Sequence, residues 1–237
     1  MRESHRPLVR LALAGLAALL CSAPAPGQNR HRVLFPPEDL GLLESPDRDL
    51  WQKPDQIMDS LGIADGSKVA DIGAGGGWFT VRLARRVGPN GVVWAEDVQA
   101  EMLEATKRRV DRENLKNVSY KRGSPDDPML PAGSLDAVLI VEAYQEIKNG
   151  NPQLFLENVR AALRPGGRVG VVDYKHAGGG PGPDTGRPDP EGVVQVAERA
   201  GLRLVKRESF LPFQFFLVFA KPTPEPDSRP GRARTLY

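Results

Sequence analysis

Apolar residues in the central part of the chain alternate between two patterns. Short runs rich in Val, Ile and Leu are separated by longer stretches in which apolar residues recur at helical spacing. Strands that alternate with helices are typical of a parallel, doubly wound α/β sheet. The pattern predicts strands at Lys68–Ile72, Gly91–Val98, Val118–Arg122, Leu135–Val141 and Arg168–Tyr174. It predicts helices at Phe79–Val87, Ala100–Arg112 and Pro152–Leu163.

Two segments carry signals that end a helix. Gly62 follows the apolar spacing of Gln56–Leu61 and predicts a short helix before the sheet, with the glycine as its C-cap. The Arg-Pro-Gly-Gly sequence of Arg164–Gly167 predicts the end of the Pro152–Leu163 helix and a break before the next strand.

The C-terminal part has a different organisation. A Gly- and Pro-rich loop is followed by a predicted helix at Glu191–Ala200 and by two apolar runs, Leu202–Phe210 and Phe213–Ala220. The runs are joined by only Leu211 and Pro212, so they must pair antiparallel. Because Phe213–Ala220 is apolar on both faces, we expect it inside the sheet, beside the Arg168–Tyr174 strand.

The first 27 residues have the three parts of a secretory signal. Basic residues open the chain, an apolar stretch follows at 11–20, and small residues with proline come after it. This order predicts a signal peptide at 1–27 and an exported, periplasmic protein, with no membrane span after cleavage. A cytoplasmic protein, or one anchored by a lipid on Cys21, stays an alternative.

The remaining chain suits one domain with short appendages. We predict a polar, Pro-rich lead-in at 28–56, the domain at 57–221 and a disordered tail at 222–237, where almost nothing is apolar. A formal charge of +2 with no dense basic run gives no indication of a nucleic-acid partner. Cys21 is the only cysteine, which excludes an intramolecular disulfide and a cysteine-rich metal site, and we expect no metal.

The most informative stretch is VADIGAGGG, at 69–77, a buried strand that runs into a glycine-rich turn. Glycines permit positive φ and let a ligand approach the backbone. A dinucleotide site is the obvious alternative, but Trp78 stands where its third glycine belongs, and Asp71 would repel a pyrophosphate. An acid there suits the ammonium and sulfonium groups of S-adenosylmethionine. The predicted cofactor contacts in the turn are Asp71, Gly73, Ala74, Gly75 and Gly77.

Further cofactor contacts follow the next two strands. Asp97 ends the second strand about twenty residues beyond the glycines, where a carboxylate can accept both ribose hydroxyls, and Glu96 should point away from it. Val98 and Met102 come next, and Met102 can cover a ring face. After the third strand, Asp126 can accept the adenine amino group, although an ordinary turn would also use an acid there.

VADIGAGGGWFT, DDPMLP, SLDAVLIVEAYQEI, LRPGGRVGVVDY and FLPFQFFLVFAK occur in this order between residues 69 and 221. Together they resemble the class I S-adenosylmethionine-dependent methyltransferases, specifically small bacterial proteins near the ubiquinone/menaquinone-biosynthesis type. The resemblance covers about 48–221. It implies a Rossmann-like seven-stranded sheet, mostly parallel with the last strand antiparallel, S-adenosyl-L-methionine at the carboxyl ends of the early strands, and methyl transfer as the activity.

The sequence departs from the relatives at two positions. Gln145 stands where they often carry His after Tyr, which removes any role for an imidazole there. Ser124 replaces an acidic residue common after the third strand, which is why Asp126 is assigned to adenine.

Acceptor-side candidates follow the fourth and fifth strands. Methyl transfer needs alignment and desolvation, and it needs a base only if the acceptor must lose a proton. The candidates are Glu142, Tyr144 and His176, with Tyr174 and Lys175 beside them. Trp51, Trp78, Tyr144 and Phe213 are candidates for an apolar acceptor pocket, although such aromatics are more often core.

Three functions stay open on the sequence alone. A methyltransferase acting on a small molecule is favoured over one acting on a macromolecule. The Asn/Asp-Pro-Pro-aromatic signature of amino methylation on DNA bases does not follow the fourth strand, which makes an amine acceptor less favoured without excluding it. A non-catalytic protein that binds S-adenosylmethionine or a nucleoside in the same pocket is the main alternative. An NAD-dependent oxidoreductase is disfavoured by Asp71 and Trp78. The acceptor, the atom methylated and the oligomeric state are left open.

Overall fold

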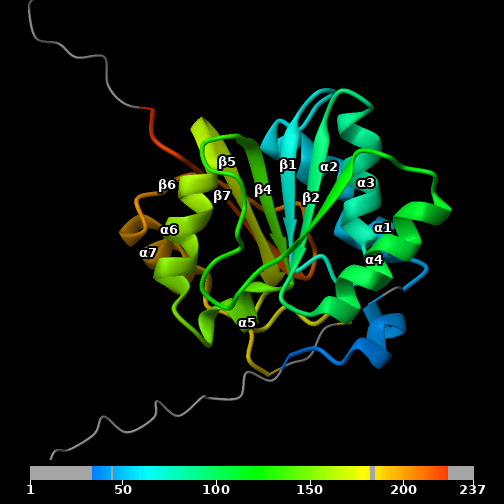
Figure 1. Cartoon of the computed structure of the whole chain (residues 1–237). Coiled ribbons are helices and arrows are strands. Elements are labelled where there is room, and N and C mark those ends of the chain that lie inside the picture. The colour runs from blue at the N-terminus through cyan, green and yellow to red at the C-terminus, as the bar shows by residue number, and fades with distance from the viewer. Residues whose placement is uncertain (1–33, 44, 182–184, 224–237) are drawn as a thin grey trace, which may run out of the picture. The chain divides into compact units, whose positions relative to one another are not determined.

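The computed structural model describes residues 34–43, 45–181 and 185–223 (Figure 1). The predicted signal peptide at 1–27 and nearly all of the predicted tail at 222–237 lie outside these residues, so both stay predictions. No helix among the described residues is long and apolar enough to cross a membrane.

The described residues form a seven-stranded sheet in the order β3-β2-β1-β4-β5-β7-β6. The five strands from β3 to β5 are parallel, and β7 runs antiparallel to both β5 and β6. This confirms the predicted fold. The strands are β1 (Lys68–Ile72), β2 (Val92–Asp97), β3 (Val118–Arg122), β4 (Leu135–Val141), β5 (Leu163–Tyr174), β6 (Arg203–Glu208) and β7 (Gln214–Ala220).

Helices cover both faces of the sheet (Figure 1). They are η1 (Pro37–Leu43, a 3₁₀ helix), α1 (Arg48–Gln52), α2 (Pro54–Leu61), α3 (Trp78–Val87), α4 (Ala100–Arg112), α5 (Tyr144–Lys148), α6 (Pro152–Ala162) and α7 (Pro190–Arg199). Helix α2 ends at Gly62 with a left-handed φ of 71°, as predicted. The short helix α5 was not predicted.

The sheet separates two apolar cores because successive side chains on a strand point to opposite faces. Val69 and Leu139 pack with residues of α2 and α3 on one face. Ala70 and Ile140 pack with residues of α6 and α7 on the other. Every parallel strand therefore delivers its carboxyl end between two helical layers, where a ligand cavity can form.

Strand β7 lies inside the sheet and is buried on both faces, as predicted. Phe216 and Val218 belong to the α2/α3 core, and Leu217 and Phe219 belong to the α6/α7 core. All four are at most 1% exposed. The more polar β6 takes the edge position instead.

The prediction for the start of β5 was wrong. The strand begins at Leu163, not at Arg168, and α6 ends one residue earlier, at Ala162. Leu135 pairs with Leu163 and Ala137 with Arg168, so 164–167 bulge out of the ladder. Lys221, the residue after β7, stabilises the bulge: its O accepts from Gly166 N at 3.1 Å and its N donates to Gly167 O at 2.8 Å. The Pro-Gly-Gly sequence ends the helix without ending the sheet.

Candidate active site

A cavity of about 540 Å³ opens at the carboxyl ends of β1, β2, β4 and β5. The lead-in helps to line it, although the sequence placed 28–56 outside the domain. The lining residues are 34–36, Leu40, Ser45, Arg48, Trp51, 71–76, Trp78, Phe79, 96–99, Met102, Ser124, Pro125, 141–143, 145–147, Phe155, Asp173, Tyr174 and Pro181.

The glycines of the turn after β1 have two different tasks. Gly73 and Gly75 line the cavity at φ values of 68° and 54°. A Cβ on Gly73 would lie 2.5 Å from Ala143 Cβ, so the turn also packs directly on the end of β4. Gly77 does not line the cavity; a Cβ there would lie 3.0 Å from Thr106 Cγ2, which indicates that this glycine lets α4 approach.

Asp71 and Asp97 hold the turn from two sides. Thr80 Oγ1 donates to Asp71 Oδ2 at 2.6 Å, and burial raises the pKa of Asp71 to about 7. Asp97 Oδ2 accepts from Gly75 N at 3.0 Å and its Oδ1 accepts from Gln99 N at 2.9 Å. Burial raises the pKa of Asp97 as well. Both carboxyl groups line the cavity, together with Val98 and Met102.

Glu96 is more closely involved than the alternation of side chains indicated. It lines the cavity, is 2% exposed, and its Oε1 has no hydrogen-bond partner. Burial, followed by the charge of Asp97, raises the pKa of Glu96 well above its ordinary value. A Cβ on Gly123 would meet Glu96 Oε1 at 1.8 Å, so that glycine makes room for the acid.

Asp126 lies outside the cavity lining. Its Oδ1 accepts from Asn151 N at 3.2 Å, next to the start of α6. Ser124 and Pro125 are the residues of this loop that line the cavity. The side chain of Asp126 therefore bonds the start of α6, while Asp127 makes the local turn bond, from Met129 N to its Oδ1 at 2.7 Å.

The structure separates the three acceptor-side candidates. Glu142 lines the cavity at a φ of 56°, and its Oε1 accepts from Gln214 Nε2 at 2.8 Å. Tyr144 lies in the α6/α7 core, where its hydroxyl has no hydrogen-bond partner. Burial raises the pKa of that hydroxyl to about 12, so it stays protonated near neutral pH and cannot act as a base there. His176 is exposed and outside the lining.

Arg48 is the main site residue that the sequence analysis missed. It is 7% exposed, and its Nε donates to Gln52 Oε1 at 2.8 Å. Gln52 Nε2 donates in turn to Gln214 Oε1 at 2.7 Å, and Arg48 Nη2 lies 3.5 Å from Glu142 Oε1. These residues are far apart in sequence, and an isolated arginine in a polar lead-in gives no signal of burial.

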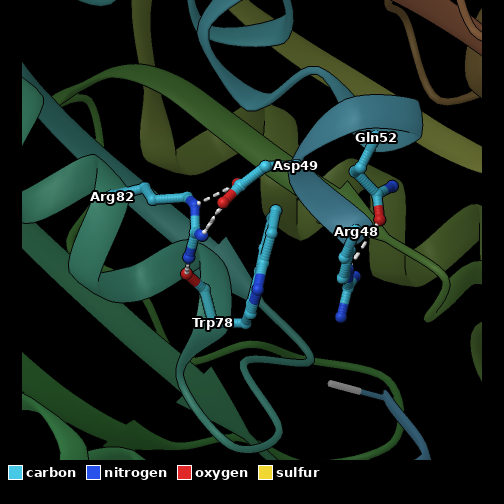
Figure 2. A network of polar contacts seen from close by, with 5 residues as sticks. All are labelled: Arg48, Asp49, Gln52, Trp78 and Arg82. Atoms are coloured by element: carbon cyan, nitrogen blue, oxygen red, sulfur yellow. Dashed lines mark hydrogen bonds and ion pairs between the residues drawn. The ribbon is translucent and has the colours of Figure 1, made fainter. Parts of the chain in front are cut away.

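Trp78 lies between two guanidinium groups (Figure 2). Arg82 Cζ is 3.5 Å from one of its ring centroids, and Arg48 Cζ is 4.3 Å away on the other side. Arg82 also bonds both carboxylate oxygens of Asp49, at 2.7 and 2.8 Å, and Trp78 O at 2.9 Å. This network connects α1, in the lead-in, to α3, one of the helices that cover the sheet.

The far end of the cavity combines aromatic rings with acids. Trp51 lies 6.4 Å from Tyr174 and 6.0 Å from Phe213, measured between ring centroids, but Phe213 does not line the cavity. Asp173 Oδ1 accepts from Tyr174 N at 2.8 Å, while its Oδ2 has no hydrogen-bond partner. Burial raises the pKa of both Asp173 and Glu146 to about 7.

Residues 69–167 match the family model described as a methyltransferase domain. This central part of the chain is similar to a methyltransferase domain. The demethylmenaquinone methyltransferase of Lactococcus lactis subsp. lactis (strain IL1403) is 30% identical to it over 128 residues, 54% of this chain and 49% of that protein. The nocamycin O-methyltransferase of Saccharothrix syringae is 32% identical over 117 residues, 49% of this chain and 41% of that protein.

A solved structure extends the likeness beyond the matched residues of the methyltransferase domain. The S-adenosylmethionine-dependent methyltransferase from Aquifex aeolicus has a TM-score of 0.74 and 25% sequence identity, over 79% of this chain and all of that one. The chain spans about half the length of the curated relatives it matches. The comparisons confirm the class I, S-adenosylmethionine-dependent type and its closeness to the quinone-biosynthesis group.

Proposed function

We propose that this protein transfers a methyl group from S-adenosylmethionine to a small-molecule acceptor held in the 540 Å³ cavity. The observation that carries the proposal is the meeting of Asp71, the open backbone of Gly73–Gly75 and Asp97 at one end of that cavity. The methyl donor supplies a carbon already activated by its sulfonium. The protein's task is therefore to align and desolvate the two reactants.

The charges at this end match the groups of the donor. Asp97 is placed to accept the ribose hydroxyls, and Asp71 offers a negative charge to the ammonium or sulfonium group. Arg48 lowers the pKa of Asp71 through its charge, which indicates that the two are close. We assign Arg48 to the donor's carboxylate, because a guanidinium pairs well with that group. Met102 and Val98 are placed to contact the adenine.

Catalysis then requires an acceptor whose lone pair faces the methyl carbon in line with the bond to sulfur. As the new bond forms, the bond to sulfur breaks and its electron pair stays on sulfur. Apolar side chains of the lead-in, Trp51 among them, line this part of the cavity and exclude water from the reaction.

Calorimetry tests the proposal against its two alternatives. The full chain should bind S-adenosylhomocysteine and show no heat with NAD. Binding of NAD alone would favour an oxidoreductase. If the chain binds S-adenosylhomocysteine but converts no S-adenosylmethionine to it with any of a broad set of acceptors, a non-catalytic binding protein is favoured.

We also propose that the protein is exported. The support is the order of basic, apolar and small residues in 1–27. Mass spectrometry of the protein from its native cells should find an N-terminus near Gln28. An intact Met1 on cytosolic protein would refute export, and a lipid on Cys21 at the N-terminus would replace it with anchoring.

A further inference from the structure

Acids greatly outnumber bases around the cavity. Among the described residues, the charged groups that line it are one guanidinium, Arg48, and six carboxyl groups: Asp71, Glu96, Asp97, Glu142, Glu146 and Asp173. The methyl donor carries a net charge of about +1, from its sulfonium, ammonium and carboxylate groups, which leaves an excess of acid. Asp71 and Asp97 are assigned to the donor, and Glu96 precedes Asp97 in β2. The remaining three acids, Glu142, Glu146 and Asp173, come from three different elements, and the charges of Glu142 and Glu146 both act on Asp173.

Of these three acids, Glu142 is occupied by the protein itself. It accepts from Gln214 and lies 3.5 Å from Arg48. Asp173 differs, because it is 3% exposed and its Oδ2 has no hydrogen-bond partner. An isolated buried carboxylate is costly, so such a group either takes up a proton or acquires a cation.

The nearby lysines do not neutralise Asp173. Lys148 is close enough for its charge to lower the pKa of Asp173 slightly, but its Nζ donates to Gly186 O. Lys175 Nζ donates to Leu211 O at 2.9 Å. Both ammonium groups therefore bond backbone carbonyl oxygens, which leaves Asp173 Oδ2 available to a proton or to the cation of a ligand.

The aromatic rings at this end also attract positive charge. Arg187 Cζ lies 5.2 Å from the ring centroid of Tyr174, and Arg48 Cζ lies 6.0 Å from that of Trp51. Asp173 lies next to Tyr174 in the sequence, and both residues line the cavity.

We propose that the methyl acceptor is a primary or secondary amine that enters as an ammonium ion, with Asp173 Oδ2 as its partner and Glu146 beside it. The proposal rests on the proposed methyl transfer. The ammonium gives one proton to the Asp173 carboxylate, which becomes a carboxylic acid. The nitrogen lone pair then attacks the methyl carbon, the carbon–sulfur bond breaks, and its electron pair stays on sulfur. The methylated product leaves as an ammonium ion, and Asp173 loses its proton to solvent.

Binding of matched amines and alcohols to the full chain saturated with S-adenosylhomocysteine tests the proposal. Ethylamine, cyclohexylamine and phenethylamine would each be titrated beside ethanol, cyclohexanol and 2-phenylethanol. At least one amine should bind about 10-fold or more tightly than its alcohol, because a buried charge-assisted hydrogen bond is gained. The same amine should release S-adenosylhomocysteine from S-adenosylmethionine.

Two variants locate the effect. Asp173→Asn and Glu146→Gln should each weaken the amine about 10-fold while S-adenosylhomocysteine affinity changes less than about 2-fold. Glu113→Gln, on an exposed acid that pairs with Arg85, is the matched control and should change neither. Two variants are used so that the loss of fold in one leaves the other informative.

The outcomes separate this proposal from the proposed function. Failure to bind S-adenosylhomocysteine refutes the methyltransferase itself. Normal binding of it overturns the amine proposal if each alcohol binds as well as its amine, or if no amine binds. Faster turnover of a neutral hydroquinone, such as 2-methyl-1,4-naphthohydroquinone, than of every amine would also overturn it.

Discussion

The two ends of the cavity are built in different ways. The donor end comes from two short segments, 71–76 and 96–99, whose backbone and two acids, Asp71 and Asp97, provide most of the proposed contacts to the donor. The acceptor end gathers Trp51, Glu142 and Asp173 from three distant parts of the chain, and Gln214 of β7, which does not line the cavity, donates to Glu142. The first end is encoded locally and held by backbone hydrogen bonds. The second exists only once the lead-in, β4, β5 and β7 have come together.

This difference decides what substitutions should do. At the donor end, a change distorts a turn whose shape is part of the binding site, so fold and affinity should suffer together. At the acceptor end, a change alters charge inside a frame already fixed by packing, so stability and ligand preference should separate. The following predictions test that division, from the largest expected effect to the smallest.

Gly73→Ala should have the largest effect. Its Cβ would lie 2.5 Å from Ala143 Cβ, at a φ that L residues avoid, so we expect a loss of about 2–4 kcal/mol in the free energy of unfolding. Gly66→Ala is the matched control, because Gly66 has a φ of 80° with nothing within 4 Å of its Cβ. It should cost about 1–2 kcal/mol, from the backbone strain alone. Equal losses in urea denaturation would mean that the turn can move away from Ala143.

Asp97→Ala should weaken S-adenosylhomocysteine by about 2–4 kcal/mol, because it removes the proposed ribose acceptor and the bond to Gly75 N. Calorimetry gives the affinity. Asp136→Ala, on an acid at the opposite end of the sheet that pairs with Arg164, is the control and should leave the affinity unchanged. Unchanged affinity in Asp97→Ala would remove Asp97 from the donor site.

Asp173→Asn should stabilise the protein increasingly as the pH rises. Burial holds the pKa of Asp173 at about 7, above its ordinary 3.8, so between these values the folded chain binds more protons than the unfolded chain. The parent therefore loses folding free energy as the pH rises through this range. The Asn variant has no carboxyl group to ionise, so it does not lose that stability. The gain over the parent should grow by about 1–3 kcal/mol from pH 5 to pH 8, a few degrees in Tm.

The control for this pH series is Asp111→Asn, because Lys107 lowers the pKa of that exposed acid. Its difference from the parent should stay flat from pH 5 to pH 8. A flat difference for Asp173→Asn as well would show that Asp173 is ionised and compensated in the folded protein. Glu142 and Glu146 add to the raised pKa of Asp173, so Glu146→Gln should reduce the effect.

Asp49→Ala should have the smallest effect. It removes the ion pair that fixes α1 to α3 through Arg82, but the carboxylate is 59% exposed, so the loss should stay within about 1 kcal/mol. The expected result is a small drop in Tm and a similarly small loss of S-adenosylhomocysteine affinity. A large loss of affinity with an unchanged Tm would show that the lead-in, through Arg48, controls the donor end.

The sequence was sufficient for most of the fold because its signals are local. Alternation and helical spacing located every strand of the sheet, and the short link between the last two runs predicted their antiparallel pairing. In the structure β6 ends at Glu208 and β7 begins at Gln214, so the link has five residues, not the predicted two. The bulge at 164–167 could not be predicted, since it depends on hydrogen bonds to Lys221, which follows β7 far along the chain. Helix α5 has only five residues, too few to show a helical period.

The site divides in the same way. Asp71, Gly73, Gly75 and Asp97 were found because strand ends and glycine turns have a recognisable order. Tyr144 was assigned to the site, but after the turn at Glu142 it lies in the core. Asp126 was assigned to adenine, but Ser124 and Pro125 are the residues of its loop that line the cavity. Arg48 carries no local signal, because its burial depends on the Gln52–Gln214–Glu142 contacts made across the fold.

The position of Trp78 between two guanidinium groups has an optical consequence. The chain contains three tryptophans, and two of them, Trp51 and Trp78, line the cavity, while Trp94 packs against the α6/α7 core. Indole emission responds to nearby charge and to water, so a bound ligand that displaces solvent and draws Arg48 toward itself should change the intrinsic fluorescence. The protein thus carries its own spectroscopic probe of occupancy, with Trp94 as an internal reference.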